Sequence, residues 1–512
     1  MAEKKKENIV AIIDIGSNEL RLRIAERSKR GIGFIESLQY PLNLAKDTFN
    51  KGKISYDKVN KVCEILLGFL KVCEDYGVSF IKAIATTAIR EAVNRPYILD
   101  QIKIKTGLDI RLIDDNTEKL YIFKMMSYIM NEELKDSTMM SYTGSGSVGV
   151  AFWENGSIPI IQNIRAGSLR LSEMFEALSE YSSEYYLVFE EFLSDYMCSM
   201  ENKAPETIKN FIASGIELPM IAKLCEGGKD ENFFHIEREK FLKFYDEIKF
   251  KPFERIAKDY GIPQDKAYIL LAEMSIYKSL INFTDAKEIL VPNIFLAEAL
   301  AFESLYSDEL SKIDKEFNKN TLMSAERIAE QYGSSEAHYS LVSKFCMEIF
   351  DKMKKIHGLG KKDKLLLQTA AIVHDCGKYV NMQDHHIHSY HLIKGSEIAG
   401  LSKDEIDIVA NIALYHSRNV PNMEDDNYKG LKESKKVLVS KLAAVLRLAD
   451  AMDRSKMQKF TDISVRIEGN ELIVNASTDK NCELEQWAFE DKGVFFEEVF
   501  GMRPVMRIRK VI

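Results

Sequence analysis

Histidine is concentrated in one part of this 512-residue chain. Eight of the nine histidines lie between residues 338 and 416, and the ninth is His235. The same stretch holds a His-Asp doublet at 374–375 and the segment HHIHSYH, and an aspartate follows at 450. Imidazoles and carboxylates ligate divalent cations, and a bound cation lowers the pKa of its water so that hydroxide becomes available. The pattern predicts a hydrolytic site for manganese, iron, zinc or magnesium.

This arrangement resembles the HD superfamily of metal-dependent phosphohydrolases. The superfamily carries a His, a His-Asp doublet and a distant Asp, which correspond here to His338, His374-Asp375 and Asp450. The alternative is that these histidines cap helices or fill polar positions in a core. A set of this size favours the metal site.

The resemblance also implies roles for neighbouring residues. His388 and His416 stand where two-metal members carry additional ligands, and Lys378 of HDCGKYV is placed to contact phosphate. We expect the remaining histidines of HHIHSYH to lie behind the ligands or on the surface; they are His385, His386 and His391.

A second candidate site lies near the N-terminus, where an apolar run leads into DIGSN at residues 14–18. A strand that ends in an Asp and a Gly turn brings a carboxylate and backbone N–H groups together, as phosphate-plus-metal sites require. Two further strand–helix junctions carry Arg90 and Glu118. Each has a structural alternative, because Asn116 would cap a helix that favours an acid in its first turn and Arg90 could pair with Glu91.

In this order and spacing, the motifs resemble the exopolyphosphatase and guanosine pentaphosphate phosphatase family. The likeness covers about residues 1–305 and includes RAGSLRLSE at 165–173 and IASGIELPMIAKL at 212–224. It implies the RNase H-like fold of sugar kinases, heat-shock proteins and actin, and in-line hydrolysis of a phosphoanhydride bond.

The family resemblance assigns roles to the N-terminal residues. Glu118 would be the base that activates water, Arg90 would hold a phosphoryl group and Asp14 would help to hold magnesium. Two loops would bind phosphate, with Gly16, Ser17, Asn18, Gly144, Gly146 and Ser147.

The second of these loops departs from the family pattern. The family has Asp-x-Gly-Gly-Gly-Ser-x-Glu, whose two acids help to hold magnesium, whereas this chain has YTGSGSVG. Tyr142 and Gly149 therefore replace the two acids. Because hard cations prefer charged oxygen ligands, we expect weakened divalent-metal binding here.

Apolar periodicity indicates the elements that position these residues. Strands are predicted at 8–15, 19–25, 79–85, 107–113, 139–152 and 157–163, with a helix at 56–76. Helices dominate from about 170 to 316 and again from 320 to 456. A hairpin around Gly-Asn, a helix near 483–490 and a strand at 503–511 follow.

The predicted fold class is α/β plus all-α. We expect two actin-like α/β domains at 1–125 and 126–305, a helical HD domain at 320–456 and a small α+β C-terminal domain at 457–512.

Composition narrows the functional classes. With 46% hydrophobic and 29% charged residues, the chain is typical of folded globular protein. Its 70 basic and 78 acidic residues give a net charge of −8, which argues against a sequence-specific nucleic-acid binder. Seven scattered cysteines, and no apolar run near the ~18 residues of a membrane span, predict a cytoplasmic protein without a membrane partner. The family likeness implies a possible homodimer.

Three functions remain open. The first is a phosphoanhydride hydrolase that releases terminal phosphate from polyphosphate or a guanosine pentaphosphate-like nucleotide. The second is a metal-dependent phosphohydrolase in the HD domain, with a degenerate N-terminal half as sensor. The third is a sensor that binds polyphosphate or nucleotide without turnover.

Overall fold

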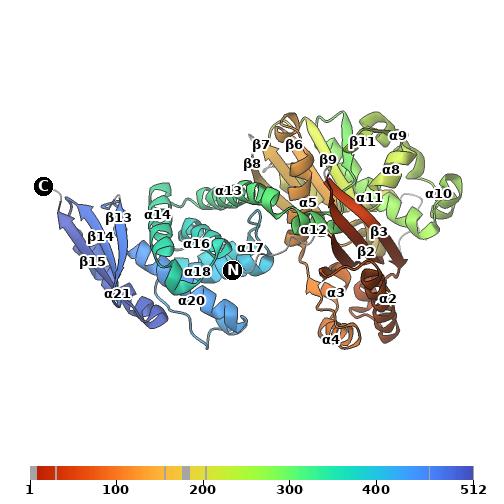
Figure 1. The fold of residues 1–512 in the computed structure, drawn as a ribbon. Coiled ribbons are helices and arrows are strands. Elements are labelled where there is room, and N and C mark those ends of the chain that lie inside the picture. Colours follow the sequence, from red (N-terminus) through yellow and green to blue (C-terminus); the bar gives the residue numbers. More distant parts are fainter. Residues whose placement is uncertain are drawn as a thin grey trace. The chain divides into compact units, whose positions relative to one another are not determined.

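A computed structural model describes residues 9–28, 31–154, 157–175, 185–201, 204–460 and 462–510 (Figure 1). Residues 8 and 511 of two predicted strands lie outside these ranges. The chain forms two compact units, Met1–Phe317 (the first unit) and Asn318–Ile512 (the second unit). None of the helices within the described residues is both long and apolar enough to cross a membrane.

The first sheet of the first unit has the strand order β3-β2-β1-β4-β5. Its strands are β1 (Ile9–Ile15), β2 (Glu19–Ser28), β3 (Gly31–Pro41), β4 (Ile81–Ala85) and β5 (Arg111–Leu112). In β2, Leu20, Leu22 and Ile24 are buried because alternate side chains of a strand point to one face. The predicted hairpin is present, since β1 and β2 pair in antiparallel register. β3, which the pattern did not predict, extends this hairpin.

Five helices accompany this sheet: α1 (Ala45–Lys51), α2 (Tyr56–Asp75), α3 (Thr87–Glu91), α4 (Arg95–Thr106) and α5 (Asp115–Ile129). The predicted stripe on α2 is buried, with Val59, Val62, Leu66 and Phe69 facing the core. Helical spacing of apolar residues therefore identified this element correctly.

The second sheet repeats the plan of the first. Its order is β10-β11-β12-β9-β6-β7-β8, so β8-β7-β6-β9-β12 matches β3-β2-β1-β4-β5, with an antiparallel meander followed by parallel strands. The strands are β6 (Thr138–Thr143), β7 (Val148–Glu154), β8 (Ser157–Ile164), β9 (Asn210–Gly215), β10 (Gly228–Lys229), β11 (Phe233–Glu237) and β12 (Glu288–Pro292). The chain turns after β1 and after β6 at equivalent points of the two sheets.

Helices dominate the described part of the region from 170 to 316, as predicted, but the strands β9 to β12, which the pattern did not predict, also lie within it. Short apolar runs do not distinguish a buried strand from part of a helix. A 3-10 turn, η1 (Glu133–Lys135), precedes β6. The helices that accompany the second sheet are α6 (Ser168–Phe175), α7 (Tyr185–Glu201), α8 (Leu218–Leu224), α9 (Arg238–Ile248), α10 (Phe253–Tyr260), α11 (Gln264–Asn282) and α12 (Leu296–Leu305).

The second unit begins within α13 (Ser307–Gln331) and is mainly helical up to residue 451. Its elements are α14 (Glu336–Lys352), α15 (Lys354–His357), α16 (Lys361–Val373), η3 (Cys376–Tyr379), α17 (His385–Gly395), α18 (Lys403–Leu414), α19 (Asp426–Lys429) and α20 (Glu433–Ala451). Apolar faces of α14, α16, α18 and α20 meet in one core.

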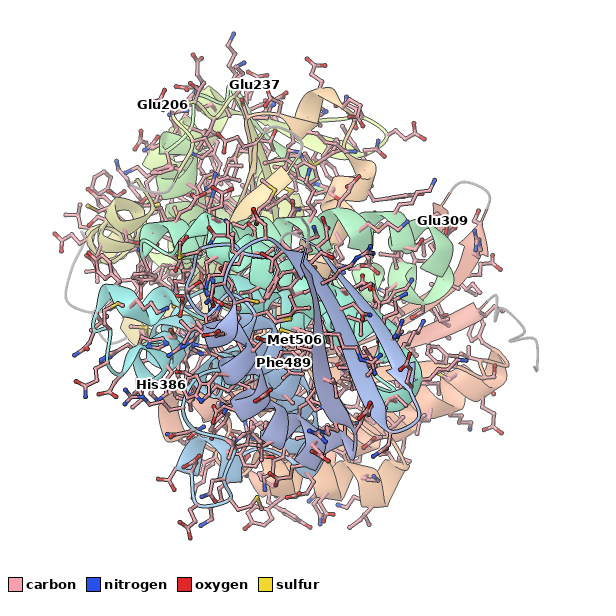
Figure 2. All side chains as sticks on the ribbon, turned by 90° about the vertical axis from the view of Figure 1, so that its left-hand side faces the viewer. Glu206, Glu237, Glu309, His386, Phe489 and Met506 are labelled. Carbon is pink, nitrogen blue, oxygen red and sulfur yellow. The ribbon has the colours of Figure 1, made fainter. Side chains whose placement is uncertain are left out.

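The C-terminal elements share this core. β13 (Ile463–Glu468) and β14 (Glu471–Thr478) form the predicted hairpin, α21 (Glu483–Phe500) follows, and β15 (Arg503–Lys510) pairs parallel to β14. Phe489 of α21 is buried in the core and Met506 of β15 packs against it; both are labelled in Figure 2. The helices and the C-terminal sheet thus form one compact unit.

Candidate active site and metal centre

The turn between β1 and β2 lies beside the equivalent turn after β6. Ser145 Oγ donates a hydrogen bond to Ser17 Oγ at 2.8 Å, which joins the two loops. A Cβ on Gly16 would lie 2.8 Å from the carbonyl oxygen of Glu19, so this position requires glycine. The tight turn leaves Ser17 and Asn18 at the wall of a cleft.

This cleft lies within the first unit, and its volume of about 690 Å³ includes space that is open to solvent. Five predicted site residues line it: Asp14, Gly16, Ser17, Asn18 and Glu118. The other polar lining residues are Glu19, Arg21, Thr86, Tyr142, Ser145, Ser168, Glu217 and Lys266. Apolar residues complete the wall: Leu169, Ile216, Ile269, Phe295 and Leu296. One surface therefore combines acidic, basic and hydrogen-bonding groups.

Asp14 is the most strongly perturbed acid of the cleft. It lies on β1 opposite Arg21 of β2. Burial raises the pKa of Asp14 to about 7; Arg21 opposes this shift, and the nearby carboxylate of Glu118 adds to it. Its Oδ1 atom is buried without a hydrogen-bond partner. An acid in this state is suited to accept a cation or a proton.

Glu118 lies in the first turn of α5, as predicted, but its cap differs from the prediction. Asp114, not Asn116, is the N-cap, and its carboxylate accepts hydrogen bonds from the backbone N–H groups of Asn116 and Thr117 at 3.1 Å. Asp114 also has the extended backbone that a cap requires. The Glu118 side chain is buried, and Tyr142 Oη donates a hydrogen bond to its Oε1 at 2.9 Å. Burial raises the pKa of Tyr142 well above its usual value, so the phenol is a neutral donor.

Arg90 does not line the cleft. Its guanidinium forms an ion pair with Asp115 Oδ1 at 2.6 Å and donates a hydrogen bond to the Ile113 carbonyl at 2.6 Å. It lies 3.8 Å from Glu91. These contacts join α3 to the start of α5. The basic side chains that do line the cleft are Arg21 and Lys266, which sequence reasoning did not assign to the site.

The second glycine loop, residues 144–147, forms hydrogen bonds within itself and with Asp115. Its predicted phosphate-binding residues are not among those that line the cleft. The Gly144 N–H donates to the Ser147 carbonyl at 2.9 Å, and Ser147 Oγ donates to Asp115 Oδ1 at 3.1 Å. A Cβ on Gly146 would lie 2.5 Å from Thr87 Cγ2, so this glycine permits close packing. Ser145 is the loop residue that reaches the cleft.

Lys119 explains why residue 149 is glycine. A Cβ at Gly149 would lie 2.3 Å from Lys119 Cγ. The Lys119 side chain is 1% exposed; its ammonium group contacts Ser147 Oγ and lies 4.0 Å from Asp115. A buried lysine therefore fills the space beside the position where the resembling family has an acid.

These contacts bear on magnesium binding in the cleft. Among the described residues, no group of three metal-ligand side chains converges there. Of the described residues that line the cleft, Asp14 has a fully buried carboxylate oxygen without a partner, and Mg²⁺ commonly takes one or two carboxylates together with substrate phosphates. The described protein residues alone therefore do not make a complete magnesium site in the cleft.

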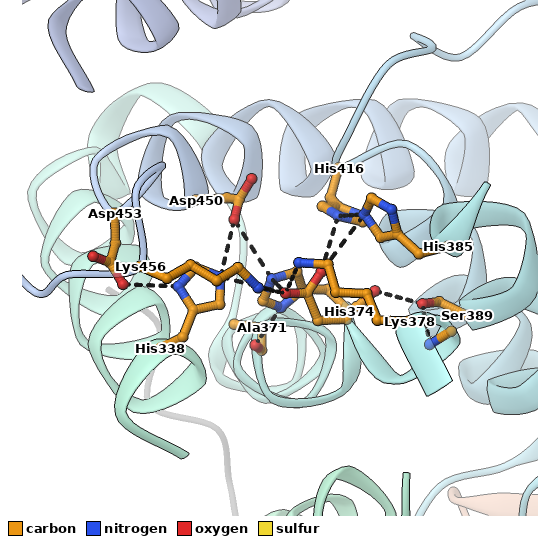
Figure 3. A network of polar contacts seen from close by, with 12 residues as sticks. His338, Ala371, His374, Lys378, His385, Ser389, His416, Asp450, Asp453 and Lys456 are labelled. Atoms are coloured by element: carbon orange, nitrogen blue, oxygen red, sulfur yellow. Dashed lines mark hydrogen bonds and ion pairs between the residues drawn. The ribbon is translucent and has the colours of Figure 1, made fainter. Parts of the chain in front are cut away.

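The second unit does bring metal-ligand groups together. Two groups have all their ligand atoms within 4.8 Å: His338, His374 and Asp450, and His374, Asp375 and His416. These five residues are called the metal centre below. They come from α14, the end of α16, the turn after α18, and α20 (Figure 3). His388 is half-buried and belongs to neither group.

His385, which sequence reasoning did not expect among the ligands, lies beside the metal centre. Its Nε2 lies 3.2 Å from His416 Nε2 and 3.6 Å from Asp375 Oδ1. His385 and His388 are three residues apart on α17, so the sequence pattern placed both on nearly the same helix face. The helical spacing contains no signal that selects His385.

Hydrogen bonds orient the histidine rings. Nδ1 of His374 and of His385 lies 2.8 Å and 3.1 Å from a backbone carbonyl oxygen, and His416 Nδ1 is bonded to a carbonyl in the same way. His338 Nδ1 lies 2.8 Å from Asp453 Oδ2. Because each acceptor is an oxygen, Nδ1 carries the proton in the neutral ring and Nε2 carries the lone pair.

The atoms that face the middle of the metal centre lack partners. His338 Nε2, His374 Nε2 and Asp375 Oδ1 are buried without a hydrogen bond. His338 Nε2 and His374 Nε2 lie 3.2 Å and 3.6 Å from Asp450 Oδ1. Buried polar atoms normally have partners, and a proton or a metal cation between such atoms would supply one. The residues present fit a divalent ion.

Burial and mutual contacts set the charge states of the centre. Although burial raises it, the neighbouring His338 and His374 rings hold the pKa of Asp450 well below its usual range. Burial and the neighbouring His374 lower the pKa of the His416 imidazole well below its usual value. Asp450 is therefore ionised and His416 is neutral, as metal ligation requires.

Lys378 also lies at this centre. Its ammonium group contacts Asp375 Oδ2, and the ammonium group of Lys456 contacts the same oxygen. Lys456 is a residue that sequence reasoning missed. It lies in the turn after α20, 81 residues from Asp375, and no local motif links the two.

The repeated sheets, with a loop at the end of each first strand and acids in the cleft beside them, define an actin-like α/β protein with a site suited to phosphoryl groups. The chain belongs to the Ppx/GppA phosphatase family. The family model matches residues 23–307, and the model of Ppx/GppA phosphatase domain III matches residues 322–492.

Individual relatives are distant in sequence. The chain is 21% identical over 462 residues to a guanosine-5'-triphosphate,3'-diphosphate pyrophosphatase of Pseudoalteromonas translucida, with 87% of each chain covered. It is 26% identical over 115 residues to exopolyphosphatase 1 of Mycobacterium bovis, which covers 22% of this chain and 33% of that protein. The crystal structure of an exopolyphosphatase from Cytophaga hutchinsonii matches with a TM-score of 0.52 and 16% identity, over 58% of this chain and 98% of that one. This last likeness shows the shared fold.

Proposed function

We propose that this chain releases the terminal phosphate of inorganic polyphosphate or of a guanosine pentaphosphate-like nucleotide in the cleft of the first unit. Its family and named relatives make it a hydrolase that acts on phosphoanhydride bonds. The observation that carries the cleft assignment is Glu118, a buried carboxylate that lines the same cleft as the Gly16–Asn18 loop and Ser145.

Glu118 is the base in this proposal. Its Oε1 accepts the Tyr142 hydrogen bond, and this contact holds the carboxylate in one orientation. The other oxygen is left to accept a proton from the attacking water. A fixed base and a fixed phosphate give a near-attack geometry, which is the main protein contribution to phosphoryl transfer.

Positive charge for the phosphates comes from Arg21 and Lys266 in this scheme. Both line the cleft, where Arg21 pairs with Glu19 and Lys266 pairs with Glu217, whereas Arg90 pairs with Asp115 outside the cleft lining. We assign to Arg90 the role of positioning the start of α5, and thereby Glu118, in place of the phosphate contact that the resemblance implies. Backbone N–H groups of Ser17 and Asn18 add donors for the phosphate oxygens.

Phosphate release by the full chain tests the proposal. Polyphosphate and guanosine pentaphosphate would be supplied to the wild type, to Glu118→Gln and to Glu133→Gln, whose exposed glutamate lies outside the cleft. Loss of a general base lowers kcat by about 10²–10⁴-fold, whereas the control should match the wild type. Full activity in Glu118→Gln would contradict the proposal.

The metal centre supports a second candidate function, a metal-dependent phosphohydrolase of the HD type in the second unit. The observation that favours it is the set of buried, unpartnered ligand atoms whose rings are fixed through Nδ1. A bound divalent ion would supply a Lewis acid and a water of lowered pKa. The chain itself contributes the ring orientations, the ionised Asp450 and the neutral His416.

Metal content tests this second candidate. We expect one or two equivalents of divalent ion per chain in the wild type by elemental analysis, and a clear loss in Asp375→Ala. Asp351→Ala, which removes an exposed aspartate of the same unit, is the control. Wild-type protein that takes up no manganese, iron, zinc or cobalt would contradict the metal centre without affecting the cleft proposal.

A further inference from the structure

Lys378 and Lys456 share one carboxylate oxygen at the metal centre. Both ammonium groups contact Asp375 Oδ2. The other oxygen, Oδ1, is unpartnered and lies 3.6 Å from His385 Nε2 and 3.7 Å from His416 Nε2. Asp375 therefore presents one oxygen to ligand nitrogens and the other to two cations. One carboxylate needs only one cation to balance its charge.

The two lysines are more accessible than the ligands. The side chains of His338 and His374 are 2% and 0% exposed, whereas those of Lys378 and Lys456 are 23% and 36% exposed. Figure 3 shows the two lysine side chains approaching each other, Lys456 from the side of His338 and Lys378 from the side of Ser389. A lysine ammonium on its flexible stem can turn from a shared carboxylate to an incoming ligand.

A dedicated turn holds Lys456 in this place. Lys456 and Gln458 have left-handed backbones, with φ of 59° and 45°, which non-glycine residues adopt at a cost. Asp453 stabilises the turn, because its Oδ1 accepts the Gln458 N–H at 2.8 Å and its backbone carbonyl accepts the Lys456 N–H at 2.9 Å. The same Asp453 carboxylate orients His338. One residue thus connects the position of Lys456 to the geometry of a metal ligand.

The charge of the centre favours an anion once a cation is bound. The acidic groups are Asp375, Asp450 and Asp453, and the cationic groups are the two lysines. A divalent ion leaves an excess of positive charge among these groups when the rings are neutral. Two ammonium groups beside a metal ion suit a phosphoryl group, which carries several charged oxygen acceptors.

We propose that Lys456 joins Lys378 in a phosphoryl-binding subsite at the metal centre, so that ammonium groups from two distant segments of the chain hold one phosphoryl group. The proposal rests on the metal-dependent function proposed above for the second unit. Lys456 is the new element, because it comes from a different segment than the His-Asp doublet and its turn is built on Asp453.

The experiment uses the full chain loaded with Co²⁺ and titrated with inorganic phosphate. Histidine nitrogens give bound Co²⁺ a visible absorption that oxygen donors of the cleft do not reproduce, so the spectrum reports on this centre. The variants are Lys456→Met, Lys378→Met, the double variant and Lys456→Arg. Lys364→Met is the matched control, since it removes a 34%-exposed ammonium paired with Asp351 in the same unit.

We expect phosphate to change the wild-type spectrum in a saturable way. Each single Met variant should weaken phosphate binding by about tenfold or more, the double variant should abolish it, and Lys456→Arg and Lys364→Met should stay within a few-fold of the wild type. Unaltered phosphate affinity in the double variant, with cobalt still bound, would overturn the subsite alone. A wild type without a cobalt spectrum would overturn the metal centre and the subsite together.

Discussion

The cleft and the metal centre handle buried charge in opposite ways. In the cleft region, Tyr142 donates to Glu118, and Lys119 and Arg90 neutralise Asp115. In the metal centre, lone pairs of His338 and His374 face Asp450 with no donor between them. A satisfied buried network needs no added ion, whereas a set of unsatisfied ligand atoms indicates one.

Asp14 is the exception within the cleft. Its Oδ1 is unpartnered, yet it has no neighbouring pair of ligands with which to form a complete site. The comparison therefore suggests a division of labour. In this proposal, the first unit binds phosphate with its own side chains and loops, and the second unit binds a metal ion.

The largest effect is expected from removing the buried ammonium beside the cleft. Lys119→Met removes a buried ammonium group that contacts Ser147 Oγ and lies 4.0 Å from Asp115 Oδ1. Asp115 keeps its ion pair with Arg90, and loss of a buried contact to a charged group costs about 1.5–3 kcal/mol. Urea denaturation would measure the free energy of unfolding. Lys103→Met, which removes an exposed partner of Asp109, should cost about 0.5 kcal/mol or less. Equal stability of the two variants would show that Lys119 does not neutralise the site.

The next effect concerns the group that orients a metal ligand. Asp453→Asn weakens the contact that fixes the His338 ring, and changes of this kind lower metal affinity by about 10–100-fold. Equilibrium dialysis with Mn²⁺ would measure the affinity. Asp462→Asn alters an exposed aspartate of the same unit and should leave it unchanged. Phosphate release in the cleft should be the same in both variants, and a parallel loss would break the division of labour.

A smaller effect follows from the pKa of Asp14. Because burial raises this pKa from 3.8 to about 7, protonation stabilises the fold, and the contribution is complete below pH 3.8 and is lost as the pH rises through 7. With metal chelated, the first unit should gain about 1.4 kcal/mol between pH 8 and pH 6. Thermal unfolding at both pH values would show this gain, and Asp14→Asn should lack it. An identical pH dependence in the variant would exclude Asp14 as its source.

The smallest effect is expected from Tyr142→Phe. The variant loses a single hydrogen bond to Glu118, which is worth about 0.5–1.5 kcal/mol, so kcat should fall by about 3–10-fold. Steady-state phosphate release would measure this change, with the exposed Tyr97→Phe as control. A loss as large as that of Glu118→Gln would mean that the phenol takes part in proton transfer and does more than orient the base.

Much of the local structure followed from sequence patterns. Alternation in β2 and helical spacing in α2 predicted elements that the structure contains. The patterns failed for β9 and β12, which are short apolar runs among helices. Such runs become strands because parallel neighbours in the second sheet provide their hydrogen bonds, and those neighbours lie far away in sequence.

The sequence by itself determined which chemistries the protein carries: two glycine turns after strands, an acid at a helix start, and a concentration of histidines and aspartates. The tertiary structure decided which of these groups meet. It turned Arg90 toward Asp115, placed His385 of α17 beside Asp375, and brought Lys456 to the same Asp375. Periodicity assigns a residue to a face of its own element, but the rotation of that element and its partner depend on packing between distant segments.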